Sequence, residues 1–174
     1  GKELVRNALL SPVESERLCT LSKGKQNIVI IASDHTRPVP SKIIIPEMLC
    51  EIRKGNPDAD ITILIATGCH RGTTKQELIN KFGEEIVENE KIYIHNCDER
   101  EKLVNIGVLP SGGQCEINKI AIDALLQRVL LNLTSLRDFQ VEEKVFCPEL
   151  RAGLRCLLIT ALNLLRMKKQ GPVF

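Results

Sequence analysis

Aromatic residues are scarce in this sequence, and tryptophan is missing altogether. Aromatic side chains make up 3% of the 174 residues, which is too few for a platform on which nucleic-acid bases could stack. The net charge is only +2 at pH 7, so the chain also lacks the excess of lysine and arginine that binds phosphate backbones. Both shortages argue against nucleic acid as a partner.

Long apolar runs and paired cysteine motifs are missing as well. No run reaches the length needed to cross a bilayer, and the sequence opens without a signal-peptide pattern. The cysteines number seven, which is odd, and no two of them form a Cys-x-x-Cys pair. We therefore predict reduced thiols, a cytoplasmic location and no membrane partner.

Ligand-binding motifs with a fixed pattern are also few. The chain has three histidines, and no two of them have the spacing of metal ligands within one helix or hairpin. No Gly-rich phosphate loop of the dinucleotide or P-loop type occurs. We therefore predict no complete metal site within this chain.

Alternating strands and helices are what the first 124 residues do contain. Short, continuously apolar, β-branched runs predict strands that are covered on both faces. We predict strands at 27–33, 61–67 and 91–96, a candidate fourth strand at 102–107, and helices at 41–54, at 74–83 and from Asn118 onward. This order implies parallel strands joined by crossover helices, in a three-layer, Rossmann-like α/β fold.

The composition changes after residue 124. Residues 1–124 contain 18 Ile and 10 Leu, whereas residues 125–174 contain 1 Ile and 13 Leu. Lys and Arg outnumber Asp and Glu by 8 to 4 in the second part, but number 16 against 18 in the first. We therefore divide the chain into an α/β domain, 1–124, and a leucine-rich tail, 125–174.

Two polar loops follow the first and second predicted strands. They read "SDHTRPVPS" at 33–41 and "TGCHRGTT" at 67–74. Neighbouring parallel strands end at one edge of a sheet, where ligands of α/β folds bind, so we expect the two loops to converge there. The helix that starts near Thr74 adds backbone N–H groups suited to an anion. The side chains that we expect at this edge are Asp34, Thr36, Arg37, His70 and Arg71.

These residues also have plain structural explanations. Asp34 can simply cap a turn, and a lone loop histidine such as His70 is more often a surface residue than a catalyst. His35 is expected to point away from the loop, since it sits between Asp34 and Thr36. His95 alternates along a predicted strand with no polar partner in view.

The chemistry of the two loops favours a functional role. Arg37 can hold a carboxylate with two parallel hydrogen bonds. An imidazole typically titrates at about pH 6.5, which suits a loop histidine to proton transfer at neutral pH. An imidazole and a guanidinium above one pocket suit a small hydroxy acid or keto acid.

Four segments of the chain resemble the nickel-dependent lactate racemase family. They stand in the family's order and spacing, and the resemblance runs from about Leu4 to Asp123. The segments are "SDHTRPVPSKIIIPEML", "ATGCHRGTTKQEL", "FGEEIVEN" and "INKIAIDA". The Asp-x-Thr-Arg-Pro and Gly-x-His-Arg elements are distinctive together, although Cys69 stands where the family usually has Thr.

The resemblance implies a racemase that acts on a small 2-hydroxy acid. Family members use a nickel pincer nucleotide tethered to a lysine, and racemisation passes through a keto acid while hydride moves to the cofactor. His70 matches the first of two catalytic histidines, and Arg37 matches the arginine that holds the substrate carboxylate. Asp34, Thr36 and Arg71 are expected to line the same pocket or to contact the cofactor.

The resemblance stops at the tail. The family continues with a strand and a segment of the form "EGFIEPHFFAGFSGGRK", which carries the second histidine and the tethering lysine, and then with a domain that supplies a nickel ligand. Residues 127–149 can be back-translated so that a shifted frame encodes such a segment. We interpret the tail as a frameshift product. We expect it to be helical or disordered, with few contacts to residues 1–124 and without the family's last strand.

This interpretation makes the isolated chain an inactive fragment that does not bind the cofactor by itself. Two other interpretations stay open. A non-catalytic binding or scaffold domain would use the basic, amphipathic tail for a partner or a membrane surface. Alternatively, the chain would assist the handling of the cofactor.

Overall fold

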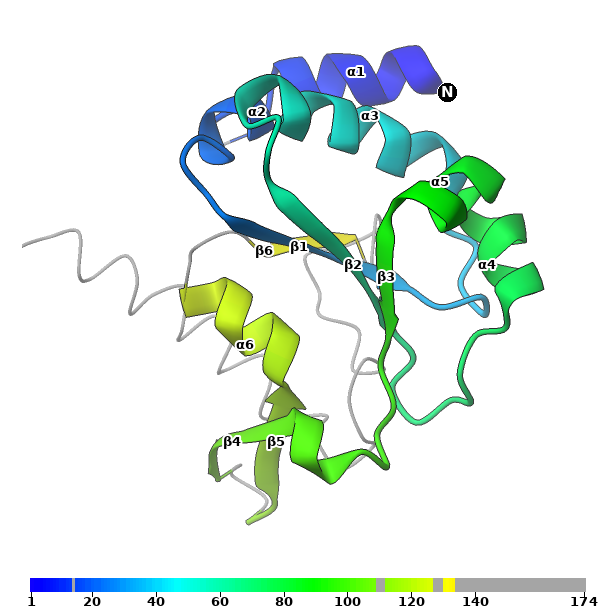
Figure 1. The fold of residues 1–174 in the computed structure, drawn as a ribbon, viewed down its shortest axis with the longest axis vertical. Coiled ribbons are helices and arrows are strands. Elements are labelled where there is room, and N and C mark those ends of the chain that lie inside the picture. Colours follow the sequence, from blue (N-terminus) through cyan, green and yellow to red (C-terminus); the bar gives the residue numbers. More distant parts are fainter. Residues whose placement is uncertain (14, 109–111, 127–129, 134–174) are drawn as a thin grey trace, which may run out of the picture.

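A computed structural model describes residues 1–13, 15–108, 112–126 and 130–133 (Figure 1). The helices are α1 (Lys2–Leu10), α2 (Leu18–Leu21), α3 (Ser41–Gly55), α4 (Lys75–Phe82), α5 (Glu84–Asn89), the 3₁₀ helix η1 (Arg100–Lys102) and α6 (Lys119–Leu126). The strands are β1 (Asn27–Ser33), β2 (Asp60–Ala66), β3 (Lys91–Ile94), β4 (Leu103–Val108), β5 (Gln114–Asn118) and β6 (Leu130–Leu133). No helix in these ranges is long and apolar enough to cross a membrane.

Parallel strands form the main sheet, in the order β3-β2-β1-β6. Strands β1 and β2 pair from Asn27 opposite Asp60 to Ser33 opposite Ala66. Helix α3 joins β1 to β2, and α4 and α5 join β2 to β3. The predicted α/β class, with parallel strands and connecting helices, is therefore confirmed.

Both faces of β1 and β2 are buried, as their continuous apolar runs predict. Side chains alternate along a strand, so Ile28 and Ile30 pack into one core with residues of α3, α4 and α5. Val29 and Ile31 pack on the opposite face with residues of β5 and α6. Figure 1 shows α1, α2 and α3 above the sheet, and α6 with β4 and β5 below it. The sheet therefore lies between two layers.

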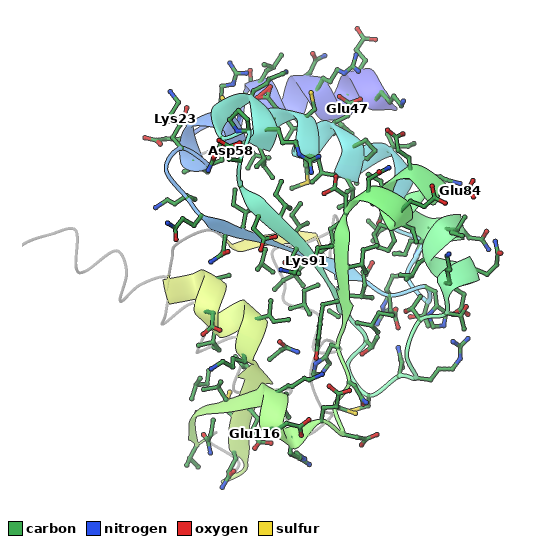
Figure 2. All side chains as sticks on the ribbon, viewed as in Figure 1. Lys23, Glu47, Asp58, Glu84, Lys91 and Glu116 are labelled. Carbon is green, nitrogen blue, oxygen red and sulfur yellow. The ribbon has the colours of Figure 1, made fainter. Side chains whose placement is uncertain are left out.

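Two glutamates on α3 tie the outer elements to the domain. Arg6 of α1 donates to both carboxylate oxygens of Glu47, at 2.7 and 3.0 Å. Figure 2 labels Glu47, where α3 lies against α1. Arg17, which precedes α2, donates to Glu51 at 3.1 Å. Both carboxylates are largely buried, and a buried charge is costly unless it is paired. These pairs therefore allow α3 to carry glutamates on an inner face.

The candidate fourth strand forms, but not in the parallel sheet. Strand β4 pairs antiparallel with β5, which the sequence did not predict. The register slips between Asn105 and Gly107, and Gly107 has a φ of +149°, a conformation that glycine adopts far more readily than other residues. A bulged hairpin therefore stands where one more parallel strand was expected.

The helix predicted for the tail is wrong at residues 130–133. These residues form β6, which pairs in parallel with β1 from Val29 opposite Leu130 to Ala32 opposite Leu133. Without β6, one edge of β1 would present unpaired N–H and C=O groups among apolar side chains. An apolar segment that satisfies this edge gains more than a short helix at the surface. The expectations that the tail makes few contacts with residues 1–124 and leaves the sheet without its last strand are wrong at the same residues. Residues 134–174 lie outside the described residues.

Candidate functional site

The loops after β1 and β2 lie side by side at the carboxyl edge of the sheet. His70 contacts Asp34, with 2.7 Å between Nδ1 and Oδ2. The two loops meet because their strands are neighbours that end in register at Ser33 and Ala66. The predicted convergence of the two loops is therefore confirmed.

The contact with Asp34 sets the protonation pattern of His70. A carboxylate only accepts hydrogen bonds, so Nδ1 of His70 carries a proton and donates it. In the neutral ring, Nε2 then holds the lone pair. The structure records no partner for Nε2 among the described residues, and the His70 side chain is 49% exposed. This nitrogen is therefore free to accept a proton from a ligand.

Asp34 is buried, yet it is held as an anion. Burial by itself would raise the pKa of Asp34, but hydrogen bonds from Thr36 and His70 outweigh it and lower the pKa. The Thr36 hydroxyl donates to Oδ1 at 2.6 Å, and the Thr36 N–H donates to the same oxygen at 3.2 Å. Thr36 therefore fixes the orientation of the Asp34 carboxylate, and this carboxylate in turn fixes the orientation of the His70 ring.

Arg37 has a fixed backbone and an uncommitted side chain. Its N–H donates to the Asp34 carbonyl at 3.3 Å, and its own carbonyl accepts from Nζ of Lys81 at 2.8 Å. Burial lowers the pKa of Lys81, while the charge of Asp34 opposes that effect. No side-chain partner of the Arg37 guanidinium is recorded within the described ranges. Arg37 can therefore bind an incoming carboxylate.

Arg71, by contrast, is already paired. Its guanidinium donates to the two carboxylate oxygens of Glu77 at 2.6 and 2.9 Å, and also to the Gly72 carbonyl at 3.0 Å. Hydrogen bonds from Arg71, and then from the Thr74 backbone, hold the pKa of Glu77 far below its usual range. A ligand that used Arg71 would have to displace this carboxylate.

Helix α4 begins with the predicted capping box. The Thr74 hydroxyl accepts from the Glu77 N–H at 3.4 Å, and the Glu77 carboxylate accepts from the Thr74 N–H at 2.8 Å. The expectation that this helix start offers its N–H groups to an anion is wrong for these two groups. Both N–H groups already have partners within the capping box, the Glu77 carboxylate and the Thr74 hydroxyl.

We expected His35 to point away from the loop, but in the structure it does not. Its side chain is only 19% exposed. Its Nδ1 lies 3.3 Å from the hydroxyl oxygen of Thr73, and its Nε2 lies 3.6 Å from Oε1 of Glu77. His35 therefore reaches across from the first loop to the second loop and to α4. Local sequence could not show this, because the partners are 38 and 42 positions away.

His95 has a polar partner that sequence reasoning missed. It lies directly after β3, and Nδ2 of Asn118 contacts its Nδ1 at 3.2 Å. The Asn118 oxygen accepts from the Ile120 N–H at 2.9 Å, which confirms Asn118 as the cap of α6 and leaves its NH₂ group to face the ring. Burial lowers the pKa of His95, with Glu99 acting in the opposite direction. His95 is therefore a neutral ring with its proton on Nε2.

The described residues contain no group of three or more His, Cys, Asp or Glu side chains that could hold a metal ion. The chemistry that these residues offer is acid–base transfer at His70 and anion binding at Arg37. One buried polar group beside these residues is also relevant to ligand binding. The Ser33 hydroxyl, at the end of β1, is buried and has no recorded partner within the described ranges.

Comparison with known proteins identifies a family and relatives that this chain resembles. The family model described as "Lactate racemase N-terminal domain" matches residues 1–132. The chain is 55% identical over 159 residues to a lactate racemase from Thermoanaerobacterium thermosaccharolyticum, and that alignment covers 90% of this chain and 37% of the relative. It is 54% identical over 123 residues to a lactate racemase from Lactiplantibacillus plantarum, covering 71% of this chain and 29% of the relative.

Solved structures give a consistent result. The apoprotein structure of the lactate racemase from T. thermosaccharolyticum superposes with a TM-score of 0.70 at 53% identity, over 75% of this chain and 31% of that chain. A crystal structure of a protein from Thermotoga maritima has a TM-score of 0.58 at 17% identity, over 76% of this chain and 33% of that chain, which shows a shared fold alone. The chain thus spans about a third of the length of its relatives.

Proposed function

Because the chain belongs to the lactate racemase N-terminal domain family, we propose that it forms the amino-terminal catalytic domain of a lactate, or 2-hydroxy acid, racemase. The observation that carries this proposal is the hydrogen-bonded pair of Asp34 and His70, on the same loops as Arg37, whose guanidinium has no recorded partner among the described residues. The relatives are about three times as long as the matched part of this chain, so the remaining parts of the site come from elsewhere in a complete protein. The chain alone is inactive as a racemase.

The residues of this chain bind the substrate and move one proton. Arg37 holds the substrate carboxylate through its two N–H edges. Nε2 of His70 takes the proton from the C2 hydroxyl, and Asp34 stabilises the imidazolium that forms. On return, His70 gives the proton back to the oxygen of the keto acid. The second histidine that the family resemblance implies would serve the opposite face of the substrate.

The described residues do not supply the ligands of a nickel pincer nucleotide. They contain no cluster of metal-ligating side chains, so we propose that nickel is not held by this chain alone. When bound, such a cofactor supplies the acceptor for the C2 hydride. The chain contributes a pocket wall made by Asp34, Thr36 and Arg71. The buried Ser33 hydroxyl has no partner within the described part of the chain, which supports a bound group at this end of β1, because buried polar groups are nearly always hydrogen-bonded.

The strand order supports the same placement of ligand. Numbered by their order along the chain, the parallel strands lie 3-2-1-4, which is the order of the first half of a Rossmann-like sheet. In such sheets, ligands bind beyond the carboxyl ends, where the strand order reverses. That point lies between β1 and β6, next to Asp34. We extend the proposal to a Rossmann-like mode of ligand binding, and a cytoplasmic location stays a prediction.

A chimera tests the proposed function directly. Residues 1–132 of this chain would replace the matched segment of the T. thermosaccharolyticum lactate racemase, which is 55% identical to this chain. The chimera, matured in a host that supplies the cofactor, should interconvert D- and L-lactate, and His70→Ala in the chimera should abolish this. A folded, cofactor-loaded chimera without racemisation, beside an active parent enzyme, would overturn the proposal.

A change of reading frame in the tail is a separate proposal, for which the observations divide. The shift in composition after residue 124 supports it. Strand β6 counts against it, and so does an alignment over 90% of the chain, which must extend past residue 124. The nucleotide sequence of codons 120–175 decides the question. A shifted frame that does not encode a "GFSGGRK"-like segment would end this proposal.

A further inference from the structure

The two loops of the site are joined by a second contact besides the one between Asp34 and His70. His35 lies next to Asp34 in the chain, and its ring crosses to the loop that carries His70. There, Nδ1 lies 3.3 Å from the Thr73 hydroxyl, and Nε2 lies 3.6 Å from the Glu77 carboxylate. The two contacts therefore start from adjacent residues of the first loop, Asp34 and His35, and reach His70 and Thr73 of the second loop.

The partners of His35 are themselves fixed. Thr73 is 4% exposed, and its hydroxyl has His35 as its recorded partner. Glu77 is held by the Arg71 guanidinium and by the Thr74 N–H. The Glu77 carboxylate lies 3.6 Å from Nε2, beyond hydrogen-bond distance, but its negative charge favours a proton on that nitrogen, so that Nδ1 of the neutral ring accepts from the Thr73 hydroxyl. The ring therefore bridges two groups that cannot easily move to other partners.

We propose that His35 is a positioning residue, which holds the 67–74 loop against Asp34 so that His70 keeps its proton on Nδ1 and its lone pair on Nε2. The value of that arrangement for catalysis rests on the function proposed above. The effect of His35 on the position of the 67–74 loop and on the His70 tautomer depends on this chain alone. Loss of His35 would leave the buried Thr73 hydroxyl unpaired, and the loop would gain freedom to separate from Asp34.

Ring-nitrogen NMR of the purified chain tests this proposal. The chain has three histidines, so long-range ¹H–¹⁵N spectra can resolve each ring and its tautomer. In His35→Ala, the His70 signals should shift from the Nδ1–H form towards a mixture of the two neutral tautomers. Hydrogen exchange of the amides at 68–73 should become about fivefold faster, as the loss of one hydrogen bond predicts.

Matched variants separate positioning from general destabilisation. Thr73→Val keeps the shape but removes the hydroxyl, so it should change His70 in the same direction, whereas Thr73→Ser should not. His35→Gln should restore part of the loss, because its amide can still bond across the loops. Lys91→Ala breaks an exposed ion pair with Asp60, where β2 and β3 begin at the end of the sheet opposite these loops, and should leave the His70 signals unchanged.

Two results would overturn the proposal. One is a His70 tautomer and loop exchange rate in His35→Ala that match the wild-type chain. The other is a loss in His35→Ala that Gln does not restore and Thr73→Val does not reproduce, since the effect would then come from lost ring volume. The spectra need neither substrate nor turnover, so an inactive chimera would leave this result standing, and the reverse also holds.

Discussion

At the scale of single residues, the charge of Asp34 determines which nitrogen of His70 is available for chemistry. Asparagine at position 34 has nearly the same shape, but its amide can turn its NH₂ group towards His70 and force the proton to Nε2. In the chimera, Asp34→Asn should therefore lower kcat for lactate by about two to four orders of magnitude, with little change in KM.

The chain offers a matched control for this substitution. Asp60 forms an exposed pair with Lys91, at 3.0 Å, at the opposite end of the sheet. Asp60→Asn changes the same functional group and should leave kcat unchanged. A rate in Asp34→Asn equal to that of Asp60→Asn would remove Asp34 from the mechanism.

Arg37 and His70 should affect different kinetic constants. Loss of the guanidinium in Arg37→Ala removes a charge-assisted pair worth about 1.5–3 kcal/mol, so KM should rise by about 10- to 150-fold. His70→Ala should instead depress kcat while the cofactor content stays near that of the parent. Steady-state kinetics with D-lactate, beside a measurement of bound nickel, would show whether the two effects separate in this way.

Sequence reasoning found the residues of the site more readily than their contacts. Asp34, Arg37 and His70 stand out because polar residues follow buried strands, and parallel strands end at one edge. The partners of His35 and His95 could not be found in the same way, because Thr73, Glu77 and Asn118 reach them only through the fold. The pairing of Arg71 with Glu77 was equally hidden, although both residues were visible in the loop and the capping box.

At the scale of elements, helix α4 depends on its amino-terminal cap. Thr74→Ala removes the hydroxyl that accepts from the Glu77 N–H, and such a loss typically costs about 1 kcal/mol of unfolding free energy. Urea unfolding should show a lower midpoint with an unchanged slope. Thr74→Ser keeps the acceptor and should unfold close to the wild-type midpoint. Equal midpoints for the two variants would contradict the role of the cap.

The buried His95, which follows β3 and contacts Asn118 at the end of β5, predicts a dependence of stability on pH. Burial lowers the pKa of His95 in the folded chain, while the unfolded chain keeps the ordinary value of about 6.5. Below that value the unfolded chain binds more protons, so the free energy of unfolding is highest above pH 6.5 and falls as the pH falls. Asp34, whose pKa is also lowered, adds to the loss below about pH 4.

Urea unfolding between pH 7.5 and pH 5 measures this effect. His95→Gln removes the group that titrates, so its stability should change less across this range than that of the wild-type chain. Two parallel stability curves would assign the loss of stability to other groups.

Whether a helix or strand could be predicted also depends on how far apart its interacting segments lie in the sequence. Strands β1, β2 and β3 and helices α3 and α4 could be predicted, because each carries its own pattern of apolar residues and α4 also carries its own cap. The hairpin of β4 and β5 was missed because "SGGQ" reads as a loop and does not show which strands it joins. Strand β6 was missed because "LLNL" has no strand signal of its own, and its pairing with Val29–Ala32 is a long-range contact.

At the scale of the whole molecule, the proposed function makes the chain one wall of a site. The purified 174-residue chain should not interconvert D- and L-lactate, because the proposed function assigns the hydride acceptor to a cofactor and gives the described residues one acid–base group, His70, for one face of the substrate. Incubation with either isomer, followed by chiral chromatography, checks this expectation. The chimera serves as the positive control, and measurable interconversion by the chain alone would contradict the proposed division of the site.

The pairing of β1 with β6 also has a consequence for how the protein is made. Val29 and Leu130 are partners, so a ribosome must add about 100 residues after β1 before β1 can gain its second neighbour. At roughly 5–20 residues per second, this takes about 5–20 s. During that time the nascent chain exposes an apolar strand edge that other chains could join. Newly synthesised copies that stop short of Leu130 should therefore depend on chaperones more than finished ones.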